Sequence, residues 1–426
     1  MTTVTRTEII VIKKSHKLWS SLDAISFLAK NLRNVALYEV RQHYFSKKKY
    51  LPYAQLAKSL TATRNVDYYA LPTKVSQGIL RGVDAEFKSF FGSLKSAKVS
   101  HKVSLPKYSL KNGRAVVPFN NQTVRFSRVT DTGLFEYSLC PKSLDIRFTS
   151  RFPNVKMVRV VPHSNYYSLE CVYDVEVPDT NISLSDAPTM GVDLGINNFA
   201  TFVTTNGHSG ILNGRPLKSI NQFYNKRKAK LQALLPKNQK TSKAIQALTT
   251  QRNFKLRWEL HQLSHLLVNH AVSSGVGTII IGNTSGWKQD SKLGKRNNQN
   301  FITIPFTRFI EQMTYKAQEA GINVVVTEES YTSKSSFLDR DHLPVYPTTS
   351  PVPAFSGKRL KRGLYRTGSG LLVNADANAA CNIIRKVAPN TYVDGVEGVV
   401  VRPVRVTALP NGLPSTNFLV TSGNND

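Results

Sequence analysis

The chain has 426 residues, of which 41% are hydrophobic, and this predicts two or three globular domains and excludes a disordered protein. Its 57 Lys and Arg face only 27 Asp and Glu, and the net charge of +30 predicts phosphate-rich partners. No apolar run approaches the roughly 20 residues of a membrane span, and the start lacks a secretory signal, so we expect an intracellular, cytoplasmic protein. A ribosomal-type protein and a membrane-surface binder are the alternatives that composition leaves open.

The N-terminal part of the chain predicts helices placed between strands. Residues 1–13 hold a β-branched run, and residues 16–45 and 74–95 space their apolar side chains as helices do. Between about 101 and 180, short apolar runs alternate with turn residues, which predicts a small barrel or sandwich. We expect the first strand to join the later sheet, with the helices as an insertion.

From residue 188 the pattern predicts an α/β layer architecture. A strand over MGVDLG leads into a second strand that ends at the turn Asn206-Gly207, and a long basic helical stretch follows at about 216–272. The remaining elements, in order, are strand TIIIG (278–282), an amphipathic helix from Phe306 to Ala320, strand NVVVTEES and a helix that begins near Asn374.

The three cysteines, Cys140, Cys171 and Cys381, lie far apart and form no CxxC pair. This spacing excludes a disulfide framework and a four-cysteine zinc site within the chain. We expect them to be small buried hydrophobic residues.

Two carboxylates stand alone in strongly basic surroundings. No acidic residue lies between Asp193 and Glu259, and none lies between Asp341 and Asp376. A carboxylate that must approach phosphates is tolerated where it binds a divalent cation, so both are candidate metal ligands. The alternatives are a strand-end residue for Asp193 and a favourable first-turn helix position for Asp376.

Five segments together resemble the RuvC nuclease domain of TnpB proteins, which are related to the type V CRISPR effectors. They occur in the family order: GVDLGINNFAT (191–201), NNQNFITIPF with MTYKAQEAG (297–321), EESYTSKSSFLD (328–339), FSGKRLKRGLYR (355–366) and NADANAACNI (374–383). The resemblance implies a multidomain α/β protein with an RNase H-like RuvC domain. The implied domains are a β-barrel (wedge-like) domain at 1–14 and 101–187, a helical recognition insertion at 15–100, the RuvC domain at 188–386 and a tail at 387–426.

The resemblance also implies a site of three carboxylates that holds two Mg²⁺ ions. Asp193 corresponds to the first acid and Asp376 to the last, but Gly282-Asn283 stand where the family has a middle Glu. In one interpretation the site has lost a ligand and the protein is an inactive RNA-guided DNA-binding repressor. In the other, the ligand comes from the paired glutamates at 328 and 329. Successive strand residues face opposite ways, and the spacing to the Thr-Ser pair favours Glu329, with Glu328 as its alternative.

Family members commonly carry two CxxC pairs after the Tyr-Thr-Ser turn, as a zinc site of the target-loading region. This chain has no cysteine there, so we expect the insert at 330–370 to fold without zinc. Hydrophobic residues are the expected substitute, namely Phe337, Leu338, Leu343 and Phe355.

The implied activity is cleavage of double-stranded DNA beside a short adjacent motif, directed by a guide RNA derived from the transposon end. Base pairing would supply the sequence specificity, and basic helices would line the channel of the guide–target duplex. We expect association with the nucleoid when DNA is bound. The candidate nucleic-acid-binding residues are Lys226, Arg227, Lys228, Lys230, Arg252, Lys255, Trp287, Lys288, Lys358, Arg359, Lys361 and Arg362.

Overall fold

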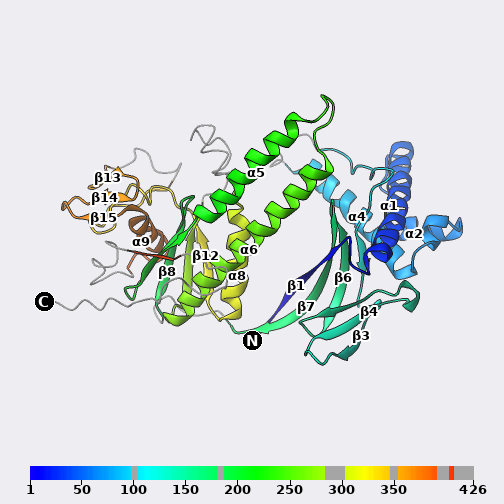
Figure 1. Cartoon of the computed structure of the whole chain (residues 1–426), viewed down its shortest axis with the longest axis horizontal. Helices are drawn as coiled ribbons and strands as arrows, with labels where there is room; N and C mark the ends of the chain where they lie inside the picture. Colours follow the sequence, from blue (N-terminus) through cyan, green and yellow to red (C-terminus); the bar gives the residue numbers. More distant parts are fainter. Residues whose placement is uncertain (97–102, 180–186, 284–302, 346–353, 391–402, 407–426) are drawn as a thin grey trace. The chain divides into compact units, whose positions relative to one another are not determined.

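The structure is a computed structural model that describes residues 1–96, 103–179, 187–283, 303–345, 354–390 and 403–406. The chain divides into two compact units, one of residues 3–176 and one of residues 177–426 with residues 1–2 (Figure 1). Each unit has its own hydrophobic core. The division falls after Glu176, whereas the sequence pattern placed it after residue 187.

Four helices follow the first strand of the N-terminal unit: α1 (Trp19–Lys47), α2 (Tyr53–Ala62), α3 (Val66–Tyr69) and α4 (Thr73–Lys95). The buried residues of α1 include Leu22, Ile25, Ala29 and Leu32, whose spacing of three or four residues forms one apolar face. This face shares a core with the strands of the same unit, so the expected helical insertion and the expected strand domain form one packed unit.

The strands of this unit form two sheets with the orders β1-β7-β6-β2 and β3-β4-β5. Their bounds are β1 (Thr2–Lys13), β2 (Val117–Phe119), β3 (Val124–Val129), β4 (Phe135–Leu139), β5 (Arg147–Ser150), β6 (Val155–Pro162) and β7 (Tyr166–Val177), with a 3-10 turn η1 (Lys142–Leu144). Within the described residues no closed barrel forms, so the expected barrel is corrected to two open sheets. Alternating apolar residues identify a strand but do not specify which strand edges pair.

A six-stranded mixed sheet with the order β12-β11-β8-β9-β10-β16 forms the centre of the C-terminal unit. β8, β9 and β10 pair antiparallel, β11 and β12 extend the sheet parallel to β8, and β16 pairs parallel with β10. The bounds are β8 (Thr189–Leu194), β9 (Asn198–Thr204), β10 (Ser209–Asn213), β11 (Thr278–Gly282), β12 (Asn323–Thr327) and β16 (Val404–Val406).

Helices cover both faces of this sheet (Figure 1). Their bounds are α5 (Arg215–Ala233), α6 (Lys243–Ser273), α8 (Phe306–Glu319) and α9 (Ala375–Val387). Met190 and Val192 of β8 share a core with residues of α6 and α8. Residue Gly191 between them faces the other side, where α9 packs. Alternation along β8 therefore divides the strand between two helical layers.

A small antiparallel sheet of β13 (Lys358–Lys361), β14 (Leu364–Arg366) and β15 (Leu372–Asn374) precedes α9. Because β15 runs directly into α9, this sheet lies beside the start of that helix. No helix among the described residues has a stretch that is both long and apolar enough to cross a membrane.

Candidate active site

Strand β8 carries Asp193 on the face that α9 covers. Gly191 and Asp193 lie on the same face because strand side chains alternate. A Cβ on Gly191 would lie 2.3 Å from the carbonyl oxygen of Ala380, so α9 rests directly on the backbone of β8. Asp193 is partly buried and stands opposite Thr201 of β9. Close helix packing therefore sets the surroundings of Asp193.

Asp376 lies in the first turn of α9 and is held from three sides. The side chain of Asn374 caps the helix and accepts hydrogen bonds of 3.0 Å from the backbone N–H groups of Asp376 and Ala377. Asn198 of β9 donates its Nδ2 to Asp376 Oδ2 at 2.7 Å. Arg359 of β13 donates its Nη2 to Asp376 Oδ1 at 3.2 Å. The carboxylate is thus oriented by β9, β13 and its own helix cap.

The electrostatics link Asp193 to two other acids. Burial raises the pKa of the Asp193 carboxyl well above its usual range, and the charges of Asp376 and Glu329 raise it further. Arg359 acts in the opposite direction and favours the charged form. The structure therefore brings Asp193, Glu329 and Asp376 into one electrostatic neighbourhood, although they come from β8, the end of β12 and α9.

Gly282 leaves the space that Glu329 uses. The parallel register of β8 and β11, continued by one residue, puts Gly282 beside Asp193. A Cβ on Gly282 would lie 2.9 Å from Glu329 Oε2, 3.1 Å from Glu329 Cβ and 2.6 Å from Ile383 Cδ1. A side chain at position 282 and the carboxylate of Glu329 thus compete for the same volume. The absence of an acidic side chain at the end of β11 therefore makes room for the glutamate that follows β12.

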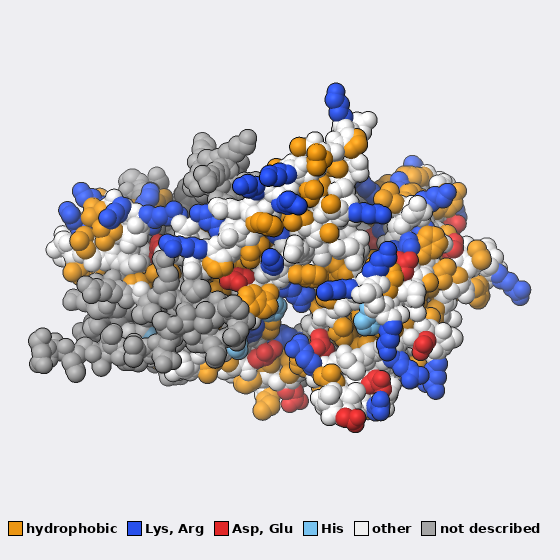
Figure 2. All heavy atoms as spheres, in the orientation of Figure 1, with side chains coloured by type: hydrophobic (Ala, Val, Ile, Leu, Met, Phe, Trp, Pro, Cys, Tyr) orange, Lys and Arg blue, Asp and Glu red, His pale blue; other side chains and the backbone are white. Residues whose placement is uncertain are grey.

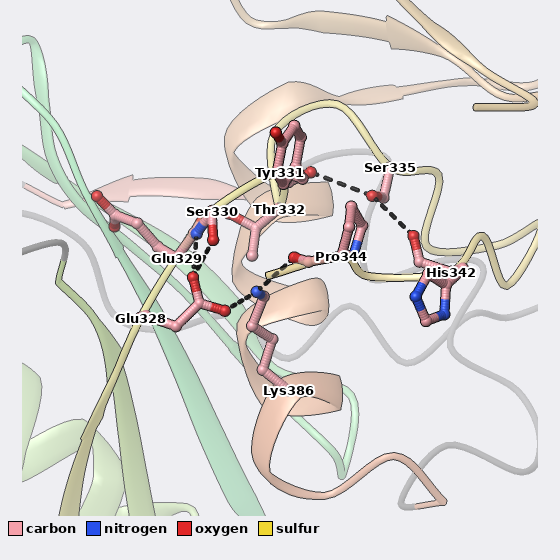
Figure 3. Close-up of polar contacts among 9 residues, drawn as sticks. All are labelled: Glu328, Glu329, Ser330, Tyr331, Thr332, Ser335, His342, Pro344 and Lys386. Carbon is pink, nitrogen blue, oxygen red and sulfur yellow. Dashed lines mark hydrogen bonds and ion pairs between the residues drawn. The ribbon is translucent and has the colours of Figure 1, made fainter. Parts of the chain in front are cut away.

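Glu328 has different partners. It pairs with Lys386 Nζ and accepts hydrogen bonds from the backbone N–H of Ser330, at 2.8 Å, and from the Ser330 hydroxyl. Lys386 also donates to the carbonyl oxygen of Pro344 at 3.1 Å. Figure 3 shows the Glu328 carboxylate turned toward Lys386 and the Glu329 carboxylate pointing away from it. Glu328 is therefore engaged in a structural ion pair with α9.

The three acids suit a divalent cation in chemistry and charge. Carboxylate oxygens are the hard ligands that Mg²⁺ prefers, and a cation relieves the repulsion that raises the pKa of Asp193. Within the described ranges, however, no three His, Cys, Asp or Glu side chains stand close enough to form a ready metal cage. Both Asp376 oxygens already accept hydrogen bonds, from Asn198 and Arg359. Metal binding thus requires the carboxylates to draw together.

Two other carboxylates hold the segment after the Tyr-Thr-Ser turn, and we call Asp339 and Asp341 the carboxylate clasp. Asp339 accepts hydrogen bonds from the Ser336 hydroxyl and from the backbone N–H groups of Gly368, at 2.6 Å, and Ser369, at 3.3 Å. Burial tends to raise the pKa of Asp339, but these hydrogen bonds outweigh it and lower the pKa.

Asp341 completes the clasp. It accepts hydrogen bonds from the backbone N–H of Ser336 at 2.7 Å and from the hydroxyl of Ser356 at 2.6 Å. Together the two carboxylates join the start of the insert to segments more than a dozen residues farther along the chain. The clasp was missed by the sequence reasoning, although this acidic pair in a basic segment was an available signal.

Hydrophobic residues contribute to the same segment. Phe337 is buried, and Leu338, Leu343 and Phe355 are partly buried. Tyr365, which the sequence reasoning did not single out, is also buried and donates its hydroxyl to the carbonyl oxygen of Lys334 at 2.8 Å. The insert thus combines apolar packing with the carboxylate clasp.

The structure places the predicted nucleic-acid-binding residues in four different situations. Those exposed to solvent are Lys226, Arg227, Lys230, Lys255, Lys358, Lys361 and Arg362, while Lys228 and Arg252 are partly buried. Arg359 is exposed but contacts Asp376. Trp287 and Lys288 lie outside the described residues. Figure 2 shows Lys and Arg side chains together with hydrophobic ones in the region of α5.

Sequence reasoning also missed the residues that orient Asp376. Asn198 falls in the segment GVDLGINNFAT, and Asn374 opens the segment NADANAACNI, so both were within the motifs that were used. Neither was expected to act because an amide gives no signal of a metal ligand. Its role depends on a contact between elements far apart in the chain.

Two family models match parts of this chain, and one curated relative matches half of it. The family described as a probable transposase, OrfB_IS605, matches residues 172–288, and the Cas12f1-like TNB domain matches residues 306–383. The TnpB-like protein ORF457 of Acidianus two-tailed virus is 27% identical over 225 residues, which are 50% of this chain and 43% of that protein. The match thus spans less than half of the relative's length.

One solved structure resembles most of this chain in fold, and a second matches it with a lower score. The cryo-EM structure of the Cas12f1–sgRNA–target DNA complex matches with a TM-score of 0.55 and 15% identity, over 85% of this chain and 82% of that chain. The mini-RNA-guided endonuclease CRISPR-Cas_phi3 matches with a TM-score of 0.42 and 9% identity, over 92% and 93% of the two chains. The first of these likenesses shows a shared mixed α/β fold.

Proposed function

Because the chain belongs to the TnpB family, we propose that it is an RNA-guided DNA endonuclease of a transposable element. It would cut double-stranded DNA beside a short target-adjacent motif. The C-terminal unit, with its RNase H-like mixed sheet, would carry the hydrolytic site. In each strand the reaction would add one water across one phosphodiester bond, which would leave a phosphate on one side of the cut and a hydroxyl on the other.

The observation that carries this proposal is the meeting of three acids from three separate elements. Asp376 and Glu329 both raise the pKa of Asp193, so their charges converge on one place in an otherwise basic chain. Such repulsion costs stability, and proteins retain it mainly at sites whose function needs it. Supporting evidence comes from Gly282, whose missing side chain leaves room for Glu329.

We propose Asp193, Glu329 and Asp376 as the ligands of two Mg²⁺ ions. When bound, the ions would make water more acidic and stabilise the leaving oxygen. Asn198 and the helix cap at Asn374 would keep the Asp376 carboxylate oriented. Arg359 would exchange its contact with Asp376 for one with a bound phosphate, because the metal ions would neutralise the acid.

The proposed partners are a guide RNA and a DNA target. The neighbour with the TM-score of 0.55 was solved with a single guide RNA and target DNA, and this supports the same class of partner here. The net charge of +30 supplies the attraction to phosphates. Exposed cations on α5, such as Lys226 and Arg227, would contribute to a channel that follows the nucleic-acid backbone.

A catalytically inactive RNA-guided DNA-binding repressor is the second candidate. It is favoured by the hydrogen bonds on Asp376 and by the lack of a ready metal cage among the described residues. A repressor would keep the basic channel and guided binding but would need no metal.

The test is reconstitution with the RNA that co-purifies with the full chain. That RNA is sequenced, its guide segment is reprogrammed, and plasmids with randomised flanks are incubated with Mg²⁺ or with EDTA. The nuclease proposal expects cuts beside one short motif with Mg²⁺ and intact plasmid with EDTA. Tight guided binding without cuts would establish the repressor, and an RNA without a reprogrammable segment would overturn both.

A further inference from the structure

A cavity of about 220 Å³ lies between α5 and α6, and none of the three acids lines it. Its apolar lining comes from both helices, with Ile220 and Phe223 on α5 and Leu248 on α6. We call it the α5–α6 pocket. Phe223 is 61% exposed, although α5 is otherwise a polar helix with few buried residues. Phe223 therefore presents an aromatic ring to solvent at the edge of an apolar pocket lining.

The pocket also has a built polar wall. Arg252 lines it, with its guanidinium carbon 5.3 Å from the centroid of the Tyr224 ring, which lines it as well. Three acceptors hold this guanidinium: Asn221 Oδ1 at 2.9 Å, Asn253 Oδ1 at 3.1 Å and the carbonyl oxygen of Thr303 at 2.9 Å. Tyr224 is fixed in turn by a 3.1 Å hydrogen bond between its hydroxyl and that of Thr249. These two planar groups are therefore preorganised.

Charge around the pocket is of one sign. Lys255 lines the opening, and Lys228 has its Nζ 5.8 Å from the Tyr224 ring centroid. The sequence from Leu194 to Trp258, which includes the whole of α5, contains no acidic residue. Gln251 and Ser219 add neutral hydrogen-bonding groups to the lining. The part of the ligand that lies outside the pocket should therefore be anionic, and the part that enters the pocket should be flat and polar.

We propose that the α5–α6 pocket binds one unpaired nucleobase of a single-stranded nucleic acid. The base stacks on the exposed ring of Phe223, its polar edge meets Gln251, and the adjoining phosphate contacts Lys255. Proteins bind single strands in this way, with aromatic platforms for bases and cations along the backbone. A base inside a duplex is covered on both faces by its neighbours, so only an unstacked one can enter.

An acidic peptide satisfies the charge but not the shape. Asp and Glu side chains offer no flat face to Phe223 and leave its ring and Leu248 exposed. A nucleotide uses the aromatic, amide and cationic groups together. The inference rests on the nucleic-acid partner proposed above but not on cleavage, so it can be tested without a working nuclease site.

The test measures binding of fluorescent oligouridylate and oligothymidylate, each about 12 nucleotides long, to the full chain. Phe223→Ala removes the stacking platform and should weaken binding about 5- to 150-fold, whereas Phe223→Trp should keep it. Leu234→Ala is the matched control, because Leu234 is 81% exposed near the end of α5 and does not line the pocket. Equal affinities of wild type and Phe223→Ala would overturn the proposal.

The salt dependence separates stacking from charge. Between about 50 and 200 mM salt, the slope of log affinity should be unchanged in Phe223→Ala, because no phosphate contact is lost. Lys255→Ala should reduce that slope by about one unit, and Lys255→Arg should restore it. A Phe223→Ala variant that changes the slope as Lys255→Ala does would contradict a stacked base.

Two further arms identify the occupant. A larger loss for oligouridylate assigns the pocket to the RNA, and a larger loss for oligothymidylate assigns it to a displaced DNA strand. A poly-glutamate peptide that displaces the oligonucleotides from wild type, and binds Phe223→Ala less well, would overturn the nucleobase assignment. Failure of the wild type to bind any oligonucleotide would overturn both this inference and the proposed partners, whereas failure to cleave leaves the inference intact.

Discussion

Two clusters of carboxylates in the described part of the C-terminal unit, the carboxylate clasp and the acids beneath α9, differ in the environment around their charge. In the carboxylate clasp, hydroxyl and backbone donors surround Asp339 and lower its pKa. Beneath α9, burial and two neighbouring acids raise the pKa of Asp193. The charged form of Asp339 therefore stabilises the folded protein, whereas the charged form of Asp193 destabilises it. Acids that hold a fold together are thus distinguishable from acids that need a ligand.

The largest expected effect concerns the acids beneath α9. Asp193→Ala, Asp376→Ala and Glu329→Ala should each lower guided cleavage by more than about a hundredfold, since loss of outer contacts to a metal ligand alone can reach that size. Glu328→Ala should retain most activity, because Glu328 pairs with Lys386 instead. Guided binding, measured on the same plasmids, should survive in all four. Full cleavage by Glu329→Ala would move the assignment to Glu328.

The next effect tests whether Gly282 belongs to the same cluster. Gly282→Ala should cost about 1–3 kcal/mol of unfolding free energy through overpacking, and it should reduce cleavage by displacing Glu329. Gly82→Ala is a suitable control, since nothing lies within 4 Å of the added Cβ on α4. Chemical denaturation and cleavage rates measure both variants. An unchanged cleavage rate in Gly282→Ala would separate Gly282 from the site.

Neutralising the Asp339 carboxylate, which accepts several hydrogen bonds, tests the carboxylate clasp. Asp339→Asn should destabilise the protein by about 1–3 kcal/mol at neutral pH, since several donors lose a charged acceptor. The folded-state pKa is depressed, so this stability is present above the unfolded pKa of about 3.9 and is lost as pH falls through the folded value. Asp145→Asn, at a side chain that is 87% exposed, is the control.

Zinc chelators should leave the midpoint of unfolding unchanged, because the insert at 330–370 contains no cysteine. Stoichiometric zinc in the purified protein would contradict this prediction.

The smallest effect has the opposite sign. Asp193→Asn should stabilise the metal-free protein at neutral pH by about 0.5–2 kcal/mol, the usual size of a single stabilising substitution. The folded-state pKa of Asp193 is raised, so its penalty is absent below about pH 3.9 and develops as pH rises through the folded value. Adding Mg²⁺ should raise the melting temperature of the wild type and not of the variant. A variant less stable than the wild type at neutral pH and without metal would place Asp193 with the structural acids.

Local patterns in the sequence singled out candidate site residues, but they did not predict the contacts around those residues. Lone acids in a basic sequence led to Asp193 and Asp376. Strand alternation allowed only one of Glu328 and Glu329 to face the site, and the spacing to the Thr-Ser pair favoured Glu329. Neither signal could place Arg359, which was expected on a nucleic-acid track and contacts Asp376. The expected barrel was wrong for a related reason, since alternation along a strand is local whereas the pairing of edges is not.

The close approach at Gly191 has a consequence for how freely this sequence can change. At Gly191 the main-chain atoms of β8 and α9 set the distance between strand and helix. Even one added carbon would collide with the carbonyl oxygen of Ala380. Apolar side chains around the contact can therefore be exchanged for others of similar volume without altering the separation of strand and helix. One methyl group at position 191 would lift the helix and carry Asp376 away from Asp193. Mutational tolerance should thus be high in the surrounding core and nearly absent at this single glycine.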